Sequence, residues 1–178
     1  MLNRKVIAQN ITNLTDARYF AAWGVDYLSF NTIPDSEYQI SPEKISEIKE
    51  WVEGPHTLIE TNALDFDELA DGLILSNIYS SLPIVKDTFF RISFDDLLKG
   101  LPGGKYISKI NDDQIDTLAK IPKDDLLGVD VYFDISDLDL SKLNKLPNFG
   151  IVIQGGEEEK VGVKSFDDLD ELYETLMA

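Results

Sequence analysis

Polar side chains end most of the segments that the sequence predicts to be strands, and some of them are able to do chemistry. Glu60 and Asp134 are carboxylic acids that can donate or accept a proton. The amide side chains can form hydrogen bonds but cannot take up a proton at any useful pH. The polar residues at predicted strand ends are Gln9, Asn10, Asn31, Glu60, Asn62, Ser76, Asn77, Ser93, Lys109, Asp134, Gln154 and Glu157. The plain alternative is that they only satisfy hydrogen bonds in their own loops.

Two glycines after the last predicted strand are candidates for phosphate binding. The backbone N–H groups of Gly155 and Gly156 could bind a phosphate, although the run 157–159 consists of glutamates that would repel an anion. A turn with positive φ explains the glycines equally well. The basic glycine loop 103–105 is a weaker signal, because it precedes a predicted strand and lacks the rest of a P-loop.

Metal and nucleophile chemistry have little support in the sequence. The chain contains no cysteine, and its single histidine, His56, precedes a predicted strand, where we expect a structural role. The run 157–159 with Asp134 and Asp137 offers oxygen ligands for a divalent cation, but runs of like charge are usually solvated faces. We therefore predict neither a metal site nor a cofactor.

Strand-like and helix-like segments alternate along the chain, which indicates a parallel β/α architecture. Helix signals include Asn13 as an N-cap, Gly24 as a stop, and Pro42 at a first helical position. The second helix is predicted to pack Ile45, Ile48, Trp51 and Val52 against the sheet, and a last helix begins at 165–168 with a capping-box pattern. The eight predicted strands are 5–10, 26–31, 57–62, 73–76, 88–93, 106–110, 130–135 and 150–154.

Eight such units are the number that closes a barrel, so the sequence predicts an α/β fold, a compact (β/α)8 TIM barrel forming one domain over 1–178. The chain of 178 residues is short for this fold, and several helices should therefore be shortened or missing. Short helices are expected at 65–70, 95–99, 112–119 and near 140–146, and none at 77–87. An open, doubly wound sheet with fewer strands is the rival architecture.

The charge balance excludes some classes of partner. Sixteen basic and thirty-three acidic residues give a formal net charge of −17, which repels nucleic acid and anionic lipid. The first residues do not resemble a signal peptide, and no apolar run is long enough for a membrane helix. We expect a cytoplasmic protein that binds neither nucleic acid nor membranes, and self-association of the chain stays open.

Several segments, in order along the chain, resemble the phosphoribosylanthranilate isomerases. Residues 10–17 (Asn-Ile-Thr-Asn-Leu-Thr-Asp-Ala) are similar to their Gly-Ile-Thr-Asn-x-x-Asp-Ala stretch, and 24–28 to their Gly-Ala-Asp-x-Leu segment. Residues 40–43 match the start of their second helix, while 155–158 and 162–164 resemble the last loop and the start of the final helix. The similarity covers both ends of the chain and is weak in the middle.

The resemblance implies a (β/α)8 barrel that performs an Amadori rearrangement of a phosphorylated aminoaldose in tryptophan biosynthesis. In that family a cysteine on the first strand is the base and an aspartate on a later strand is the acid. Here Gln9 holds the base position and cannot act as one. Motif similarity makes Asp134 the acid, whereas counting strands places Ser108 or Lys109 at that position.

Two hypotheses follow. The first is a divergent member of this family that binds a phosphorylated, sugar-like molecule, with weak or lost isomerase activity. In it Asp134 is the acid and Glu60 is a candidate replacement for the base. Its candidate substrate-binding residues are Asn10, Asn31, Lys109, Gln154, Gly155 and Gly156. The second hypothesis is a catalytically inert barrel that serves protein interaction or regulation.

Overall fold

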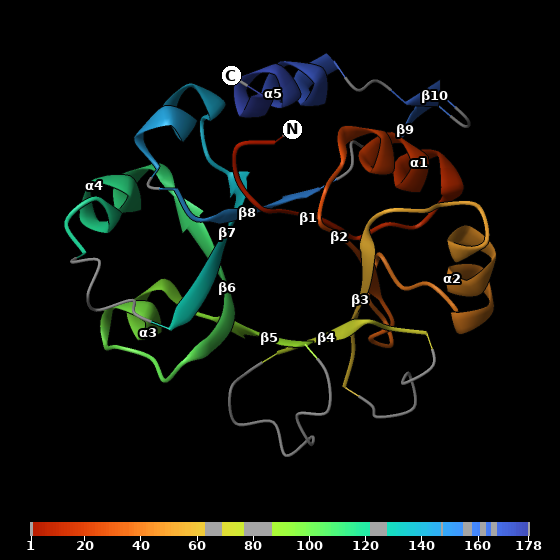
Figure 1. Ribbon diagram of the computed structural model, residues 1–178, viewed down its shortest axis with the longest axis horizontal. Helices are drawn as coiled ribbons and strands as arrows, with labels where there is room; N and C mark the ends of the chain where they lie inside the picture. Colours follow the sequence, from red (N-terminus) through yellow and green to blue (C-terminus); the bar gives the residue numbers. More distant parts are fainter. Residues whose placement is uncertain are drawn as a thin grey trace.

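Eight parallel strands of the described chain pair in sequence order and close into a barrel, because the last strand pairs with the first (Figure 1). The computed structural model describes residues 2–62, 69–76, 87–121, 128–146, 148–154, 158–160, 163–164 and 167–177. The strands are β1 (Val6–Gln9), β2 (Tyr27–Asn31), β3 (His56–Glu60), β4 (Gly72–Leu75), β5 (Asp87–Ile92), β6 (Gly104–Asn111), β7 (Val129–Asp137) and β8 (Gly150–Gln154). The closed barrel confirms the predicted fold class and excludes the open sheet.

Helices lie around the outside of the barrel (Figure 1). They are α1 (Leu14–Trp23), α2 (Pro42–Lys49), α3 (Phe94–Leu98), the 3₁₀ helix η1 (Asp112–Gln114), α4 (Ile115–Leu118), the 3₁₀ helix η3 (Leu140–Lys145) and α5 (Asp167–Met177). Several are short, as the chain length predicts: α3 has 5 residues and α4 has 4. A small antiparallel pair, β9 (Glu158–Lys160) and β10 (Val163–Lys164), precedes α5. The predictions for most of 65–70, for most of 77–87 and for the start of the capping box at 165–166 lie outside the described residues.

The first two helices begin where the sequence predicts, and α1 also ends at its predicted stop. The Asn13 side chain accepts a hydrogen bond from the Asp16 backbone N–H at 2.9 Å, and Gly24 ends α1 with a φ of 76°. Ser41 caps α2 through the Lys44 N–H. The prediction for Trp51 was wrong. Because α2 ends at Lys49, this residue lies beyond the helix and is 65% exposed.

The interior of the barrel is filled by side chains that alternate along the strands. One buried cluster has a single member from each strand: Ile7, Tyr27, Leu58, Ile74, Phe89, Ile107, Tyr132 and Val152. A second, larger cluster packs the outer face of the strands against the helices and includes Val6, Phe20 and Ile45. Since successive side chains of a strand point to opposite faces, the residue two positions after each inner member also points inward.

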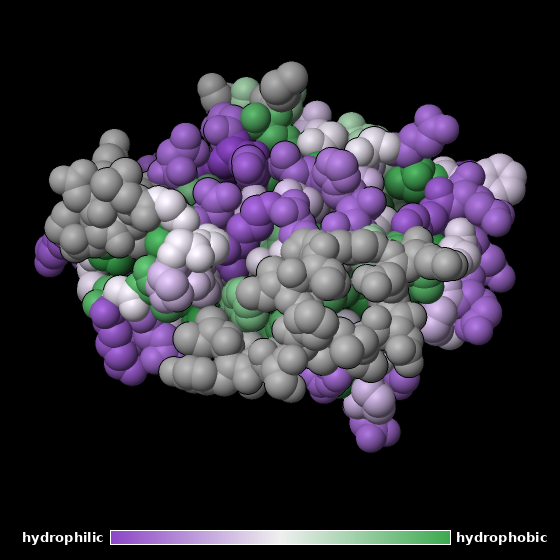
Figure 2. Space-filling model, turned by 60° about the horizontal axis from the view of Figure 1, so that its bottom comes forward, coloured by the Kyte–Doolittle hydropathy of each residue, from purple (hydrophilic) through white to green (hydrophobic). Residues whose placement is uncertain are grey.

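The surface is rich in charged groups, in keeping with the net charge of −17. In the view of Figure 2, hydrophilic side chains cover much of the coloured surface, with hydrophobic side chains between them. Of the helices in the described residues, none combines the length and apolar character needed to span a bilayer.

Candidate functional site

Four polar side chains form a layer at the carboxyl-terminal end of the barrel. Gln9, Glu60, Arg91 and Asp134 each lie two residues after a member of the inner cluster, on β1, β3, β5 and β7. Alternate strands of such barrels contribute side chains to the same interior layer, which is why these four meet. Active sites of this fold lie at the same end of the strands. We call these four residues the mouth layer.

Hydrogen bonds join the whole mouth layer into one chain. Arg91 donates to both carboxylate oxygens of Glu60, with 2.7 Å between Nη2 and Oε2. Its Nη2 also donates to Oε1 of Gln9 at 3.0 Å. The Nε2 of Gln9 in turn donates to Oδ2 of Asp134 at 3.0 Å. The Gln9 amide is therefore fixed in orientation by one bond at each end.

The mouth layer is largely removed from solvent. Gln9, Glu60 and Asp134 are 4%, 6% and 5% exposed. Burial by itself would lower the pKa of Arg91, but its hydrogen bonds to Glu60 and the charges of Glu60 and Asp134 raise that pKa above its usual value. Arg91 therefore carries its charge throughout the accessible pH range, and two carboxylates face one guanidinium.

The geometry limits what each group can do chemically. A proton taken up by Glu60 would neutralise the carboxylate and so weaken its paired bonds to Arg91. Asp134 accepts from Gln9 and, through Oδ1, from the Ser136 backbone N–H at 3.1 Å. The arrangement is better suited to holding a polar molecule in a fixed orientation than to moving protons.

The other predicted site residues lie around the same end of the barrel. Asn31 Oδ1 accepts from the Ile33 N–H at 3.0 Å, so this side chain shapes its own loop. Lys109 forms an ion pair with Asp137 at 2.9 Å, and both side chains are more than half exposed. Gln154 pairs in register with Gln9 at the end of β8.

Asn10 stands where the similar family has a glycine, and its backbone explains why another residue is tolerated there. Its φ is 58°, in the left-handed region that glycine and asparagine adopt most readily. A role of Asn10 in ligand binding remains a prediction.

The alternative positions predicted for the catalytic acid, Asp134 and Ser108 or Lys109, lie on two different strands. Asp134 lies on β7, and its carboxylate belongs to the mouth layer. On β6, Lys109 follows the inner residue Ile107 by two positions, whereas the neighbouring Ser108 alternates to the opposite, helix-facing side. Gly155, Gly156, Glu157 and Asn77 lie outside the described residues.

Arg91 was missed by the sequence analysis, although it is the one cation of the mouth layer. For the fifth strand, which was expected to span 88–93, the prediction chose Ser93 at its end and did not include Arg91. The alternation of β5 holds the signal that would have found it. Phe89 is a large apolar residue at an inner position, and Arg91 follows it by two.

Two further predictions concern residues away from the mouth. His56 begins β3, so it lies at the opposite end of the barrel, with Nδ1 at 3.9 Å from Oδ2 of Asp71. Among the described residues, no group of three or more acidic, histidine or cysteine side chains is arranged to hold a metal ion. The predicted absence of a metal or cofactor stays a prediction.

Comparison with known proteins gives a clear result only for structure. No family model and no curated protein matches the chain. Solved structures do match. A phosphoribosylanthranilate isomerase in complex with reduced 1-(o-carboxyphenylamino)-1-deoxyribulose 5-phosphate aligns with a TM-score of 0.72 and 15% identity, covering 98% of both chains. The isomerase of Thermotoga maritima aligns with a TM-score of 0.72 and 16% identity over the same shares. The chain has the fold of the phosphoribosylanthranilate isomerases.

This likeness to the isomerases concerns the fold alone. A phospho-2-dehydro-3-deoxyheptonate aldolase (DAHP synthase) of Thermotoga maritima also aligns, with a TM-score of 0.67 and 13% identity, covering 98% of this chain and 68% of that one. Enzymes with different reactions therefore share this barrel, and function has to be argued from the mouth layer.

Proposed function

We propose that the chain is a divergent phosphoribosylanthranilate isomerase-like barrel that binds a phosphorylated, sugar-like molecule at the mouth layer, with Amadori isomerase activity weak or lost. The main support for this proposal is the amide side chain of Gln9 and its two hydrogen bonds. At the position that the resemblance gives to the base stands a neutral amide, held between Asp134 and Arg91. An amide of this kind can bind a substrate but cannot remove its proton.

Glu60, the second carboxylate of the mouth layer besides Asp134, is a poor replacement for the missing base. An Amadori rearrangement needs one group that removes a proton and another that supplies one. Glu60 is engaged with Arg91 through both oxygens. Its use as a base would remove the negative charge that balances the partly buried Arg91 guanidinium, which is costly. This cost supports weak or lost catalysis.

The buried polar layer supports ligand binding. Replacing a buried ion pair by apolar side chains of similar volume is often neutral or stabilising, so polarity at this depth is not needed for a stable barrel. A guanidinium also suits phosphate and carboxylate groups because of its planar set of donors. One similar isomerase is described in complex with a deoxyribulose 5-phosphate derivative, so molecules of that class are the natural probes.

Binding is tested by thermal unfolding with inorganic phosphate, ribulose 5-phosphate and the reduced deoxyribulose 5-phosphate derivative. We expect the two sugar phosphates to raise the midpoint in a concentration-dependent way, since a ligand of the folded state stabilises it. Gln9→Leu should weaken this response, while Lys44→Gln, at an exposed ion pair on α2, should leave it unchanged. Turnover of phosphoribosylanthranilate by the unmodified chain should stay near the uncatalysed rate.

Three outcomes would overturn the proposal. Complementation of a tryptophan auxotroph that depends on Asp134 would contradict lost catalysis. An equal response of Gln9→Leu and the unmodified chain would place the ligand elsewhere. No response to any probe, together with a stable oligomer or a copurifying protein, would favour the inert interaction barrel.

A further inference from the structure

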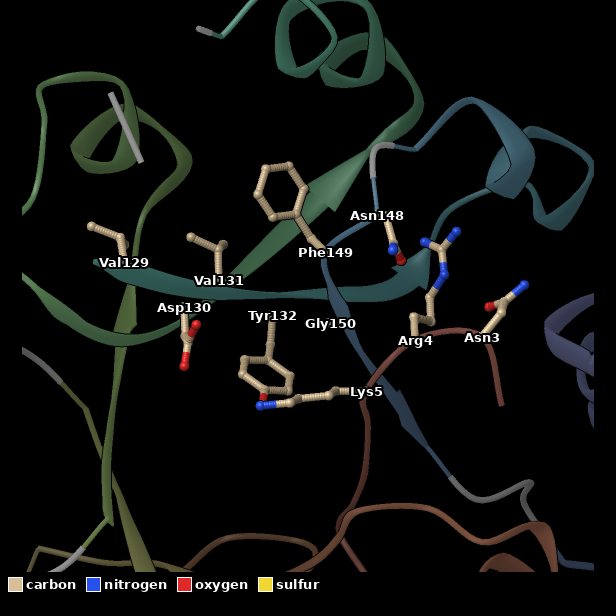
Figure 3. A pocket seen from close by; sticks show the side chains of 10 residues that line it. All are labelled: Asn3, Arg4, Lys5, Val129, Asp130, Val131, Tyr132, Asn148, Phe149 and Gly150. Atoms are coloured by element: carbon tan, nitrogen blue, oxygen red, sulfur yellow. The ribbon is translucent and has the colours of Figure 1, made fainter. Parts of the chain in front are cut away.

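A pocket of about 430 Å³ lies at the amino-terminal end of the barrel strands, away from the mouth layer (Figure 3). Its size is within the usual range of small-molecule sites. It is lined by the residues before β1 and β8 and by the start of β7, namely Asn3, Arg4, Lys5, Val129, Asp130, Val131, Tyr132, Asn148, Phe149 and Gly150. We call it the notch.

Strand register explains why a notch forms there. β7 pairs with β6 from Val129 onward, but its pairing with β8 begins only at Tyr132. The first three residues of β7 therefore extend beyond the start of β8 and leave a gap in the barrel wall. Gly150 lets the Tyr132 ring lie against β8, since a Cβ on this glycine would be 2.4 Å from the ring.

The backbone at Arg4 is held beside the notch by hydrogen bonds of the residues before and after it. The Asn3 N–H donates to the Leu176 carbonyl at 2.9 Å, and the Lys5 carbonyl accepts from the Ile151 N–H at 2.9 Å. In Figure 3 the Arg4 guanidinium and the Asn148 side-chain amide point toward one another. The segment before β1 therefore presents Arg4 from a backbone held by both β8 and α5.

Two of the three guanidinium nitrogens of the partly buried Arg4 have no hydrogen-bond partner among the described residues. Its Nε and Nη1 are shielded from solvent and have no hydrogen bond within the described structure. Burial lowers the pKa of Arg4, which reflects the same loss of water without compensation. A partly buried charge without a partner is unfavourable, and a bound anion would reduce that cost.

We propose that the notch binds a small organic anion, with the carboxylate or phosphate group on Arg4 and an apolar part against Val129, Val131 and Phe149. Arg4 and Lys5 give the notch two cations against the single acid Asp130. The charged residues that line the notch therefore sum to one positive charge, on a chain whose net charge is −17. Because no described bond holds the guanidinium, it can turn to the anion without losing one.

The three arginines of the chain allow the two proposed sites to be tested separately. Arg4 lies at the notch, Arg91 belongs to the mouth layer, and Arg18 lies with its guanidinium carbon 5.6 Å from the centroid of the Trp51 ring. Each arginine Nε–H gives its own nitrogen-15 NMR signal. Titration with benzoate, and separately with inorganic phosphate, should shift the Arg4 signal in a saturable way for at least one anion. The Arg18 signal should not move.

Variants test whether the Arg4 charge is responsible. Arg4→Gln should weaken binding of the active anion at least about tenfold, the loss expected for a charge-assisted hydrogen bond. Arg18→Gln is the matched control and should bind as the unmodified chain does. Chloride at equal ionic strength separates specific binding from screening. The anion that binds identifies the ligand class, since benzoate indicates an aromatic carboxylate and phosphate a phosphorylated molecule.

Several results would overturn the notch proposal. An unmoved Arg4 signal with both anions would do so, as would equal shifts of all three arginines, and the NMR titration needs no variant to fold. Shifts of Arg91 alone would support the mouth proposal and contradict this one. Shifts of Arg4 alone with these two anions would support the notch and leave the mouth to its sugar-phosphate test.

Discussion

Gln9 and Asp134 are 125 residues apart in the sequence, yet their side chains form a hydrogen bond of 3.0 Å in the barrel interior. The bond joins the first strand to the seventh on the far side of β8, and it continues through Arg91 to Glu60 on the third strand. One buried network thus connects strands that are not neighbours in the sheet. Changes to any member should therefore affect both stability and ligand binding.

Removal of the Arg91 charge should destabilise the fold strongly. Arg91→Met leaves the Glu60 carboxylate, which is 6% exposed, without its cation, and we expect a loss of about 3 kcal/mol in the free energy of unfolding. Lys44→Met, which breaks the exposed pair with Glu47, should cost less than about 0.5 kcal/mol. Urea unfolding measures both. The double variant Arg91→Met with Glu60→Leu should regain most of the loss, and equal costs for the two single variants would contradict the argument.

A thiol at position 9 should restore part of the missing chemistry. The resemblance implies a cysteine base there, so we expect Gln9→Cys to raise turnover of phosphoribosylanthranilate at least about tenfold, a modest share of what a positioned base supplies. Gln9→Ser is the control of similar size, because a hydroxyl is a far weaker base near neutral pH. Adding Asp134→Asn to Gln9→Cys should remove the gain. A gain in both Gln9 variants would show that the amide only obstructs the substrate.

Loss of the Tyr132 hydroxyl should not harm the protein. This hydroxyl is buried and has no hydrogen-bond partner among the residues that the structure describes, so Tyr132→Phe should leave stability unchanged or raise it by up to about 1 kcal/mol. Tyr106 is the matched control, because its hydroxyl donates to the Pro102 carbonyl at 2.9 Å, and Tyr106→Phe should cost about 1 kcal/mol. Urea unfolding at neutral pH distinguishes them. A clear loss in Tyr132→Phe would reveal a partner for this hydroxyl.

Alkaline pH gives a second measurement on the same residue. Burial, with the nearby charges of Tyr27 and Asp130, raises the pKa of Tyr132 above its usual value. A pKa that is higher in the folded than in the unfolded state gives stability that is complete below the unfolded value of about 10 and is lost as pH rises above it. Tyr132→Phe should therefore make the stability fall less steeply above about pH 10.

Acid pH should act in part through Asp112. Hydrogen bonds from Lys142 Nζ at 2.6 Å and from the Asp139 N–H at 3.0 Å lower the pKa of Asp112. A pKa lowered by folding gives stability that is present above the unfolded value of about 3.9 and is lost as pH falls through the folded one. An NMR titration of the Asp112 carboxyl should show a midpoint below its usual value, and Lys142→Met should move it back up. An unchanged midpoint in that variant would contradict the assignment.

Local signals in the sequence predicted the elements well, and long-range ones were harder to find. Asn13, Gly24 and Ser41 act through bonds within a few residues, so their pattern is sufficient. The predicted helix 112–119 is instead a 3₁₀ turn followed by α4, a difference of backbone geometry that side-chain periodicity does not distinguish.

Three of the four members of the mouth layer were predicted, because carboxylates and amides near the ends of predicted strands lie where active sites of this fold are found. Arg91 was missed because its position depends on inward alternation from Phe89, and its bonds go to Glu60 and Gln9, which are 31 and 82 residues away. The notch was not predicted either. It results from a difference in register between β6–β7 and β7–β8, and no local sequence pattern specifies such a difference.

Closure of the barrel by β1 and β8 has a consequence for synthesis of the chain. Val6 pairs with Ile151, so one edge of β1 stays open while the ribosome makes most of the chain. Open strand edges and long sequence separations favour slow folding and wrong association. During translation the nascent protein therefore carries an apolar strand with an open edge until β8 emerges, and chaperones that bind unfolded chains should act most strongly during that interval.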